Sequence, residues 1–292
     1  MKFKGIMPAL VTPLNNDESV NVQALNKLIE FLIGKDADGF YVGGATGEGI
    51  ALKTEERMVL AESAIKAVNR RKPCIVQVAA ADFGDALLLA KHAEQIGADA
   101  ISATVPVFFK YDEDDVYNYY KALAECVHIP VMIYYSPAVS FNFNADFAAR
   151  VFGIDNVTAI KWTSSNFYEM LRLKDLTNGE MNIINGPDEM LLMGLSAGAD
   201  GGIGSTYNFM LDIIKGIYNN FIGGNIEKAR DYQMRANRII HELLKTENIP
   251  TTKIILEAMG FDVGNATFPM KRYTDDDKKA IISGMKRAGV EI

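Results

Sequence analysis

Residues 130–163 read PVMIYYSPAVSFNFNADFAARVFGIDNVTAIKWT. Two apolar runs, Pro130–Tyr135 and Val157–Thr163, enclose a segment in which Asn144 is a favoured residue type for the N-cap of a helix. Both runs are apolar almost throughout, which is typical of strands in a parallel sheet that is covered on both faces. The stretch therefore predicts a strand–helix–strand unit.

The same unit recurs along the chain. The other strand-like runs are Gly5–Val11, Gly39–Gly43, Cys74–Ala79, Ala100–Val105, Met181–Asn185 and Gly201–Ser205. The other expected helix caps are Asn21, Thr54, Asp82, Asp112, Asn166 and Asp188, and an eighth helix is expected near Met210–Phe221. Eight short units in series favour an α/β fold of the (β/α)8 TIM-barrel type. An open doubly wound sheet is the alternative, because strand count is the weakest part of such an assignment.

The pattern changes after Gly224. Asn225 is expected to cap a helix, and further helices are expected near Thr251–Met259 and Thr274–Arg287, with no strand-like run between them. We therefore predict a barrel over residues 1–224 and a C-terminal helical extension over residues 225–292. The extension is expected to pack on the barrel or on a neighbouring subunit.

Composition excludes several classes of protein. The 292 residues are 49% hydrophobic and carry a net charge of −7, which is ordinary for a globular protein but repels phosphate backbones, so no nucleic-acid partner is expected. No apolar run approaches the ~18 residues of a membrane span, and Pro8 and Pro13 interrupt the stretch that a signal peptide would need. The expected location is the cytoplasm.

The chain has too few cysteines and histidines to be stabilised by disulfide bonds or a bound metal ion. Two cysteines and three scattered histidines predict neither a disulfide framework nor a zinc site. We expect no metal and no cofactor.

Chemistry-bearing residues gather at the expected C-terminal strand ends, where barrels of this type place their active sites. After the second strand, residues 43–49 read GGATGEG. Glycines in such a turn let backbone N–H groups converge on an anion, such as a carboxylate. The turn lacks the Lys-Ser/Thr of a nucleotide-binding loop, and a simple tight turn is the alternative.

The sixth and fifth strands supply an amine and a phenol. Lys161 lies near the end of an apolar strand, where loss of water favours a neutral, nucleophilic amine suited to Schiff-base chemistry. The alternative is a lysine whose amine extends to solvent. Strand alternation places either Tyr134 or Tyr135 in the barrel mouth, and a tyrosine beside such a lysine is a candidate proton shuttle.

Two later loops are polar. Asp188 and Glu189 follow the seventh strand and are either ligand contacts or charges at a helix N-terminus. Residues 201–206, GGIGST, end the eighth strand, where barrels often contact anions or hydroxyl groups.

These motifs together resemble a known family. Residues 43–48 (GGATGE), 134–138 (YYSPA), 160–163 (IKWT), 186–189 (GPDE) and 199–208 (ADGGIGSTYN) resemble the N-acetylneuraminate lyase branch of the class I pyruvate aldolases, of which dihydrodipicolinate synthase is a sister. The resemblance covers nearly the whole chain, in order. It implies a (β/α)8 barrel with a C-terminal helical region, a homotetramer and a small 2-keto acid as substrate.

The resemblance also implies residue roles. Lys161 would form a Schiff base with the ketone, and the iminium would serve as an electron sink while the bond between carbons 3 and 4 breaks or forms. Tyr134 matches the proton-transfer tyrosine, and the turn would hold the substrate carboxylate through Ala45 and Thr46. The positions that match contacts to the polyhydroxylated tail of sialic acid are Thr163, Gly186, Asp188, Glu189 and Ser205.

Three positions depart from the patterns of the family. Ala45 replaces a usual Ser or Thr, and Phe108 falls where a relay tyrosine is usual, so the expected proton relay lacks two hydroxyl groups. Tyr134 then exchanges protons with water or with the substrate carboxylate, or the substrate differs. Val139 stands where the synthase carries its carboxylate-binding arginine, which argues against the synthase activity.

Three functions remain open on the sequence. The first is cleavage of N-acetylneuraminate to pyruvate and N-acetylmannosamine. The second is the same chemistry on another 2-keto acid, such as a 2-keto-3-deoxy sugar acid, or a synthase-like reaction. The third is a non-catalytic barrel that binds a keto acid or sugar, which Ala45 and Phe108 favour and which Lys161 and Tyr134 oppose.

Overall fold

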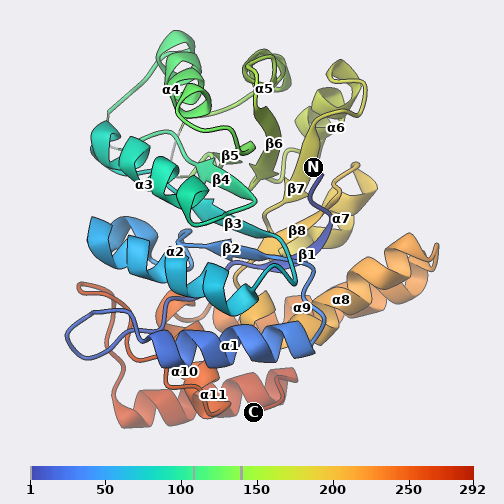
Figure 1. The fold of residues 1–292 in the computed structure, drawn as a ribbon. Helices are drawn as coiled ribbons and strands as arrows, with labels where there is room; N and C mark the ends of the chain where they lie inside the picture. Colours follow the sequence, from blue (N-terminus) through green and yellow to red (C-terminus); the bar gives the residue numbers. More distant parts are fainter. Residues whose placement is uncertain (1, 108, 139–140) are drawn as a thin grey trace.

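The computed structural model describes residues 2–107, 109–138 and 141–292. Eight parallel strands alternate with helices around a barrel (Figure 1). The strands are β1 (Gly5–Pro8), β2 (Phe40–Val42), β3 (Cys74–Gln77), β4 (Ala100–Ala103), β5 (Val131–Tyr135), β6 (Val157–Trp162), β7 (Asn182–Asn185) and β8 (Gly201–Gly204). Each lies inside a strand-like run of the sequence, so the predicted (β/α)8 barrel is confirmed.

The strand order distinguishes the barrel from an open sheet. Hydrogen bonding runs β1-β8-β7-β6-β5-β4-β3-β2, and a parallel bridge between Ala9 and Tyr41 joins the two ends. The amide of Leu10 donates to the Tyr41 carbonyl at 2.9 Å across this seam. The alternative of a doubly wound sheet is therefore wrong.

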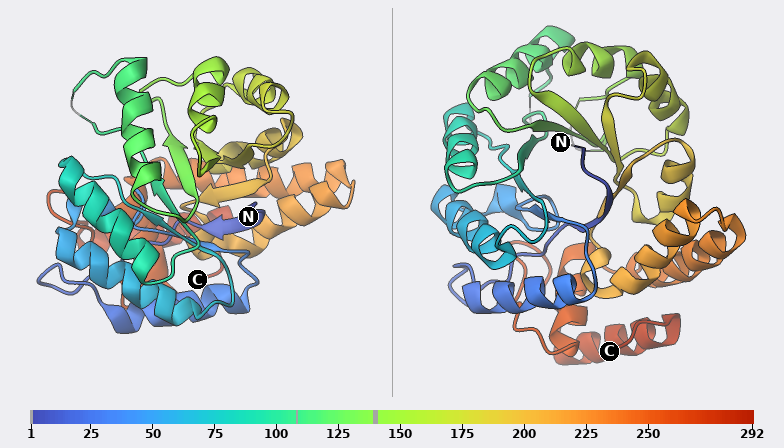
Figure 2. Two further views of the ribbon diagram at one scale, coloured as in Figure 1. Left: turned by 45° about the horizontal axis from the view of Figure 1, so that its top comes forward. Right: turned by 45° about the vertical axis from the view of Figure 1, so that its right-hand side comes forward.

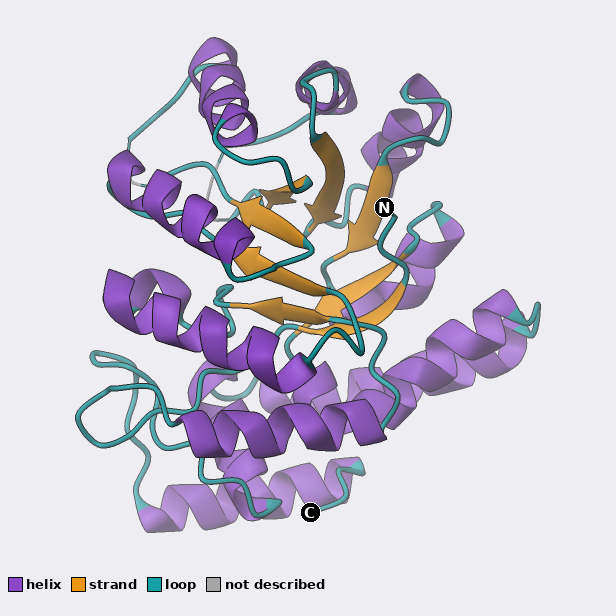
Figure 3. Ribbon diagram, in the orientation of Figure 1, coloured by secondary structure: helices purple, strands orange, loops and turns teal. Residues whose placement is uncertain are grey.

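Helices surround the strands as a ring (Figures 2 and 3). They are α1 (Val22–Gly34), α2 (Thr54–Val68), α3 (Phe83–Gln95), α4 (Glu113–Glu125), α5 (Ala145–Phe152), α6 (Phe167–Leu176), α7 (Leu191–Ser196) and α8 (Tyr207–Ile222). Short 3-10 turns, η1 (Gly49–Ala51) and η2 (Asp188–Met190), precede α2 and α7. No helix among the described residues combines the length and the apolar character that crossing a bilayer requires.

Most of the expected helix caps are confirmed. The side chains of Asn21, Asp82, Asp112, Asn144, Asn166 and Asn225 each accept a hydrogen bond from the amide three residues further on.

Two expected caps are wrong. Thr54 is the first residue of α2, after Lys53, and its hydroxyl donates to the Asp85 carboxylate of α3 at 3.2 Å. Asp188 lies inside η2, and its carboxylate accepts hydrogen bonds from Thr206 at the end of β8. Both side chains are occupied by neighbours distant in sequence, which a local pattern does not reveal.

The interior of the barrel is packed with side chains. One layer consists of Phe3, Met7, Ala9, Tyr41, Ile75, Ala100, Met132, Ala159, Ile184 and Ile203. Alternation along each strand sends these side chains inward and their neighbours outward to the helices. Phe3 is 1% exposed and belongs to this layer, so the barrel is a filled core rather than a pore.

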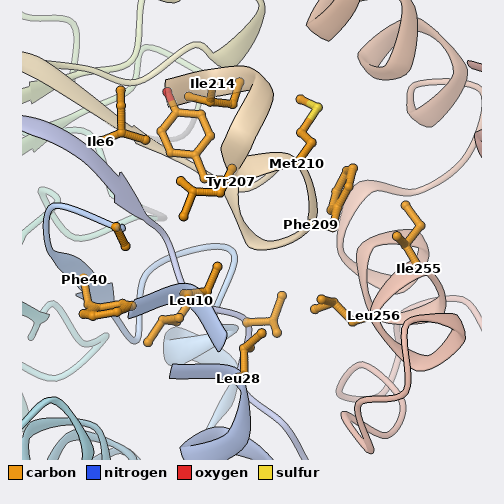
Figure 4. Close-up of a cluster of buried hydrophobic side chains, with 14 of the residues drawn as sticks. Ile6, Leu10, Leu28, Phe40, Tyr207, Phe209, Met210, Ile214, Ile255 and Leu256 are labelled. Carbon is orange, nitrogen blue, oxygen red and sulfur yellow. The ribbon is translucent and has the colours of Figure 1, made fainter. Parts of the chain in front are cut away.

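Three further helices follow the barrel: α9 (Ile226–Leu243), α10 (Asn248–Ala258) and α11 (Asp275–Ala288). Helix α9 packs against α8, and α10 packs against both α8 and α11; α11 lies below α1 in Figure 1 and in the right-hand view of Figure 2. Figure 4 shows that Ile255 and Leu256 of α10 share one apolar cluster with Leu28 of α1 and Phe209 of α8. The C-terminal helices thus pack on the barrel of their own chain; the boundary at residue 224 stays a prediction.

A buried ion pair ties α10 to the glycine-rich turn. Glu48 Oε1 lies 2.7 Å from Lys253 Nζ, and the two side chains are 0% and 2% exposed. Lys253 also donates to the Asn265 carbonyl at 2.9 Å, and Glu48 Oε2 accepts the Thr267 amide at 2.5 Å. Burial lowers the pKa of Lys253, and the charge of Glu48 opposes that effect. The pair therefore links the candidate site to the extension.

Lys253→Met should lower the free energy of unfolding by about 3–5 kcal/mol, because it leaves the Glu48 carboxylate buried and unpaired. Urea unfolding measures this change. The control is Lys279→Ala, whose partner Asp276 is 3.2 Å away but whose pair is exposed; its loss should stay below ~1 kcal/mol. Equal, small losses in both variants would contradict a stabilising role for the buried pair.

Candidate active site

A cavity of about 520 Å³ opens at the C-terminal ends of the strands. All nine residues that the sequence predicted for the site line it. They are Ala45, Thr46, Tyr134, Lys161, Thr163, Gly186, Asp188, Glu189 and Ser205. The structure thus brings together segments separated by up to 160 positions, from 45 to 205.

Lys161 and Tyr134 are direct neighbours on adjacent strands. They are register partners in the β5–β6 ladder, and each is 7% exposed. Lys161 Nζ lies 4.3 Å from the centroid of the Tyr134 ring. In the described part of the chain, the buried amine of Lys253 pairs with a carboxylate whereas that of Lys161 has no ion-pair partner. Such an amine is available to a ligand.

The structure resolves which of the two tyrosines faces the barrel mouth. Tyr134 lines the cavity, whereas Tyr135 points outward and packs edge-on against Trp162 with ring centroids 4.7 Å apart. The Tyr135 hydroxyl donates to Asn142 at 2.8 Å. Tyr134 is therefore the tyrosine whose hydroxyl can meet a ligand beside Lys161.

The glycine-rich turn presents backbone donors to the cavity. Within residues 2–107, 109–138 and 141–292, the amides of Ala45 and Thr46 donate to no protein acceptor. Gly44 is required for space, because a Cβ there would collide with the ring of Tyr41. Gly49 has the same role against the carbonyl of Gly43. A carboxylate is the kind of group that such free amides bind.

A buried hydroxyl without a partner lies on the next wall. Thr163 Oγ1 is shielded from solvent and has no hydrogen-bond partner among the described residues. A Cβ at Gly186 would collide with this hydroxyl, so Gly186 keeps room for it. An unpaired buried hydroxyl costs free energy, and a polar ligand in the cavity would satisfy it.

Asp188 lines the same cavity, and its carboxylate accepts hydrogen bonds. Its Oδ2 accepts the Thr206 amide at 2.9 Å and the Thr206 hydroxyl at 2.7 Å, with Ser205 Oγ at 3.5 Å. Burial raises the pKa of the Asp188 carboxyl to about 6, although the hydrogen bonds from Thr206 oppose the shift. Glu189 is exposed at the rim.

The C-terminal helices position this side of the site, which the sequence did not reveal. Gln233 Nε2 donates to the Asp188 carbonyl at 3.1 Å, and Asn237 Nδ2 donates to the Glu189 carbonyl at 3.1 Å. Asn248 lines the cavity and donates to Ser205 Oγ at 3.3 Å. Gln233 is a polar residue inside the buried stripe of α9, and that anomaly is the one signal in the sequence that pointed to a polar contact.

The described residues contain no group of three or more His, Cys, Asp or Glu side chains that is arranged to hold a metal ion. Phe108 and Val139, the other expected departures from the family, lie outside the residues that the structure describes.

Comparisons with known proteins agree with this geometry. The model of the Dihydrodipicolinate synthetase family matches residues 2–288. The chain belongs to this family. A relative named N-acetylneuraminate lyase from Rhizobium meliloti is 34% identical over 281 residues, covering 96% of this chain and 94% of the relative. Family membership confirms the resemblance that the motifs indicated.

Two solved structures of the Dihydrodipicolinate synthetase fold superpose closely. CdNal from Clostridium difficile, in complex with mannosamine, has a TM-score of 0.95 at 30% identity and covers 99% of this chain and 100% of its own. A dihydrodipicolinate synthase from Bacillus anthracis has a TM-score of 0.93 at 26% identity, covering 98% of each chain. Both branches of the family thus share this architecture.

Asp188→Asn should change the pH dependence of stability. Since the folded-state pKa of about 6 lies above the ordinary 3.8, the folded protein holds this proton more tightly than the unfolded chain. The contribution is full below about pH 4 and is lost as the pH rises to about 6, at about 1.4 kcal/mol per unit, or ~3 kcal/mol in all.

Urea unfolding of both proteins across this range measures the effect. The stability advantage of the wild type over Asp188→Asn should shrink between pH 4 and 6, whereas Asp276→Asn, at a carboxylate that is 94% exposed, should run parallel to the wild type. A constant difference between wild type and Asp188→Asn would show that burial does not raise this pKa.

Proposed function

We propose that this protein is a Schiff-base aldolase that reversibly cleaves N-acetylneuraminate to pyruvate and N-acetylmannosamine. The observation that carries the proposal is the Lys161 amine, which is buried in the barrel mouth without a carboxylate partner and beside Tyr134. The relative and the structural neighbour described above support the same reaction class and a sugar-sized substrate.

The chemistry follows from the amine. Neutral Lys161 adds to the ketone carbon of the 2-keto acid, and uptake of one proton with loss of one water leaves an iminium. As the hydroxyl on carbon 4 gives up its proton, the electrons of the bond between carbons 3 and 4 flow into the iminium, releasing the aldehyde and an enamine. Carbon 3 takes up the proton that the hydroxyl gave up, and hydrolysis of the iminium by one water returns pyruvate, the free amine and the proton taken up when the iminium formed.

The remaining residues orient the substrate. We assign the substrate carboxylate to the free amides of Ala45 and Thr46, and the transferred proton to the hydroxyl of Tyr134, which faces the cavity. Ala45 offers no hydroxyl to pass this proton on, so the substrate carboxylate or water receives it. Thr163, Gly186, Asp188, Glu189 and Ser205 form the polar wall that would bind a chain of hydroxyl groups.

A second candidate is an aldolase of the same mechanism that acts on a shorter 2-keto acid. The missing hydroxyl at Ala45 favours it, because that side chain differs from the usual family residue. A non-catalytic sugar-binding barrel is the weaker alternative, because binding alone does not require a buried Lys161 amine without an ion-pair partner. A homotetramer and a cytoplasmic location, which the resemblance and the composition predict, complete the proposal.

Borohydride reduction in the presence of pyruvate should attach one reduced pyruvate to Lys161, because only the imine is trapped. Peptide mass mapping locates the adduct. In the control variant Lys161→Met the chain should remain unlabelled while the other lysines are unchanged. Labelling at a different lysine, or none in the wild type, would reject the Schiff-base mechanism.

Tyr134→Phe should lower kcat by about 10²–10⁴, because it removes only the proton-bearing oxygen, while pyruvate is still trapped on Lys161. The matched control is Tyr135→Phe, whose hydroxyl binds Asn142 outside the cavity and whose kcat should stay near that of the wild type. Near-native turnover of Tyr134→Phe would mean that another group moves the proton.

The wild type should release pyruvate faster from N-acetylneuraminate than from 2-keto-3-deoxygluconate, and it should not condense pyruvate with aspartate semialdehyde. The wall that contains Thr163, Asp188 and Ser205 offers polar partners to a chain of hydroxyl groups, and each hydrogen bond from a hydroxyl to a charged carboxylate contributes about 1.5–3 kcal/mol. A coupled pyruvate assay over this panel measures the order. Release from the shorter acid alone would replace the lyase proposal by the second candidate.

A further inference from the structure

Tyr41 reaches from the opposite side of the barrel to the Lys161 amine. Tyr41 belongs to β2 and Lys161 to β6, which are four positions apart in the strand order. The Tyr41 side chain is 0% exposed and belongs to the inner layer. Lys161 Nζ nevertheless lies 4.9 Å from the centroid of its ring. The ring is therefore part of the floor on which the amine rests.

Two features fix the Tyr41 ring in this place. Its hydroxyl donates to Ser102 Oγ of β4 at 3.0 Å. Gly44 lies against the ring, where any larger residue would push it away. Tyr41 also meets Tyr134 edge-on, with centroids 6.2 Å apart and planes at 81°. The glycine-rich turn thus shapes the floor of the site as well as its anion-binding wall.

The Lys161 amine lies over two aromatic rings, at 4.3 Å from one centroid and 4.9 Å from the other. A cation within about 6 Å of a ring centroid is attracted by the negative face of the ring, most strongly where water is excluded. Burial raises the pKa of the Tyr41 phenol, so the ring carries no charge. Burial raises the pKa of the Asp188 carboxyl and the charge of Lys161 opposes that rise, but among the described residues no carboxylate forms an ion pair with this amine, and the two rings are the groups that lie directly against it.

We propose that Tyr41 is a catalytic residue whose ring stabilises positive charge on Lys161 Nζ, both in the resting ammonium, which loses a proton before the neutral amine adds to the ketone, and in the iminium that follows. The proposal deepens the proposed function and rests on it. The positive charge of the iminium draws electrons from the breaking carbon–carbon bond. A protein carboxylate paired with the iminium nitrogen would neutralise this charge and weaken that effect. An aromatic face stabilises the cation without quenching it, and it accepts no proton from the amine.

The test compares rings of equal shape at position 41. Tyr41→Phe keeps an electron-rich ring, 3,4,5-trifluorophenylalanine keeps the shape but weakens the negative face, and Tyr41→Leu removes the ring. Ser102→Ala removes the hydrogen-bond partner alone. Two readouts are used: the pH midpoint of Lys161 labelling by acetic anhydride without substrate, followed by mass spectrometry, and the dissociation constant of the pyruvate imine from borohydride trapping.

The trifluoro ring should shift the labelling midpoint down by about one pH unit and weaken the pyruvate imine about tenfold relative to Tyr41→Phe. In Tyr41→Phe and Ser102→Ala, the dissociation constant of the pyruvate imine should stay within about twofold of the wild-type value, since both variants keep the ring face. The labelling midpoint should stay close to that of the wild type. The comparison of the two rings stands even where Tyr41→Leu fails to fold.

Equal labelling midpoints and equal imine dissociation constants for the trifluoro and phenyl rings would overturn the inference. Tyr41 would then be a packing residue. So would a midpoint that rises in Tyr41→Leu, which would mean that the ring acts only by excluding water. The proposed function is judged separately: a wild type that gives no pyruvate adduct rejects the aldolase, whereas the labelling midpoints still decide what the ring does.

Discussion

A primary amine buried near the end of a strand, without a carboxylate as ion-pair partner, is the feature on which the rest of the site depends. Burying a charged lysine is costly, and elsewhere in this chain the cost is met by an ion pair, as at Lys253 and Glu48. Lys161 lacks such a partner among the described residues and lies on the faces of Tyr41 and Tyr134. The amine is thereby kept available for a carbonyl carbon.

The C-terminal helices, which follow the barrel in the chain, help to position the residues of the site. Gln233 and Asn237 of α9 hold the backbone of Asp188 and Glu189, and α10 reaches the glycine-rich turn through the Glu48–Lys253 pair. The reactive amine thus comes from a barrel strand. The wall around Asp188 and Glu189, which would bind the sugar, depends on the helices that follow the barrel.

The fold and the members of the site were predictable from sequence because both follow periodic or local rules. Strand alternation required that one of Tyr134 and Tyr135 face inward, and the family resemblance selected Tyr134. The rule that active sites lie at the C-terminal ends of barrel strands gathered Lys161 and the glycine-rich turn. The role of Asp188 was not predictable: its neighbours resemble a helix start, but its carboxylate binds Thr206 across the barrel mouth. Contacts such as Asn248 to Ser205 join segments that no local pattern relates, and the Tyr41 ring became relevant only once β2 and β6 faced each other.

A crystal structure of the protein soaked with pyruvate tests the central claim most directly. The account predicts continuous density between Lys161 Nζ and carbon 2 of pyruvate, with the carboxylate on the amides of Ala45 and Thr46 and the Tyr134 hydroxyl directed at the adduct. The nitrogen should remain above the rings of Tyr41 and Tyr134. Pyruvate bound without a covalent link to Lys161, or with its carboxylate on Asp188's side of the cavity, would contradict the account.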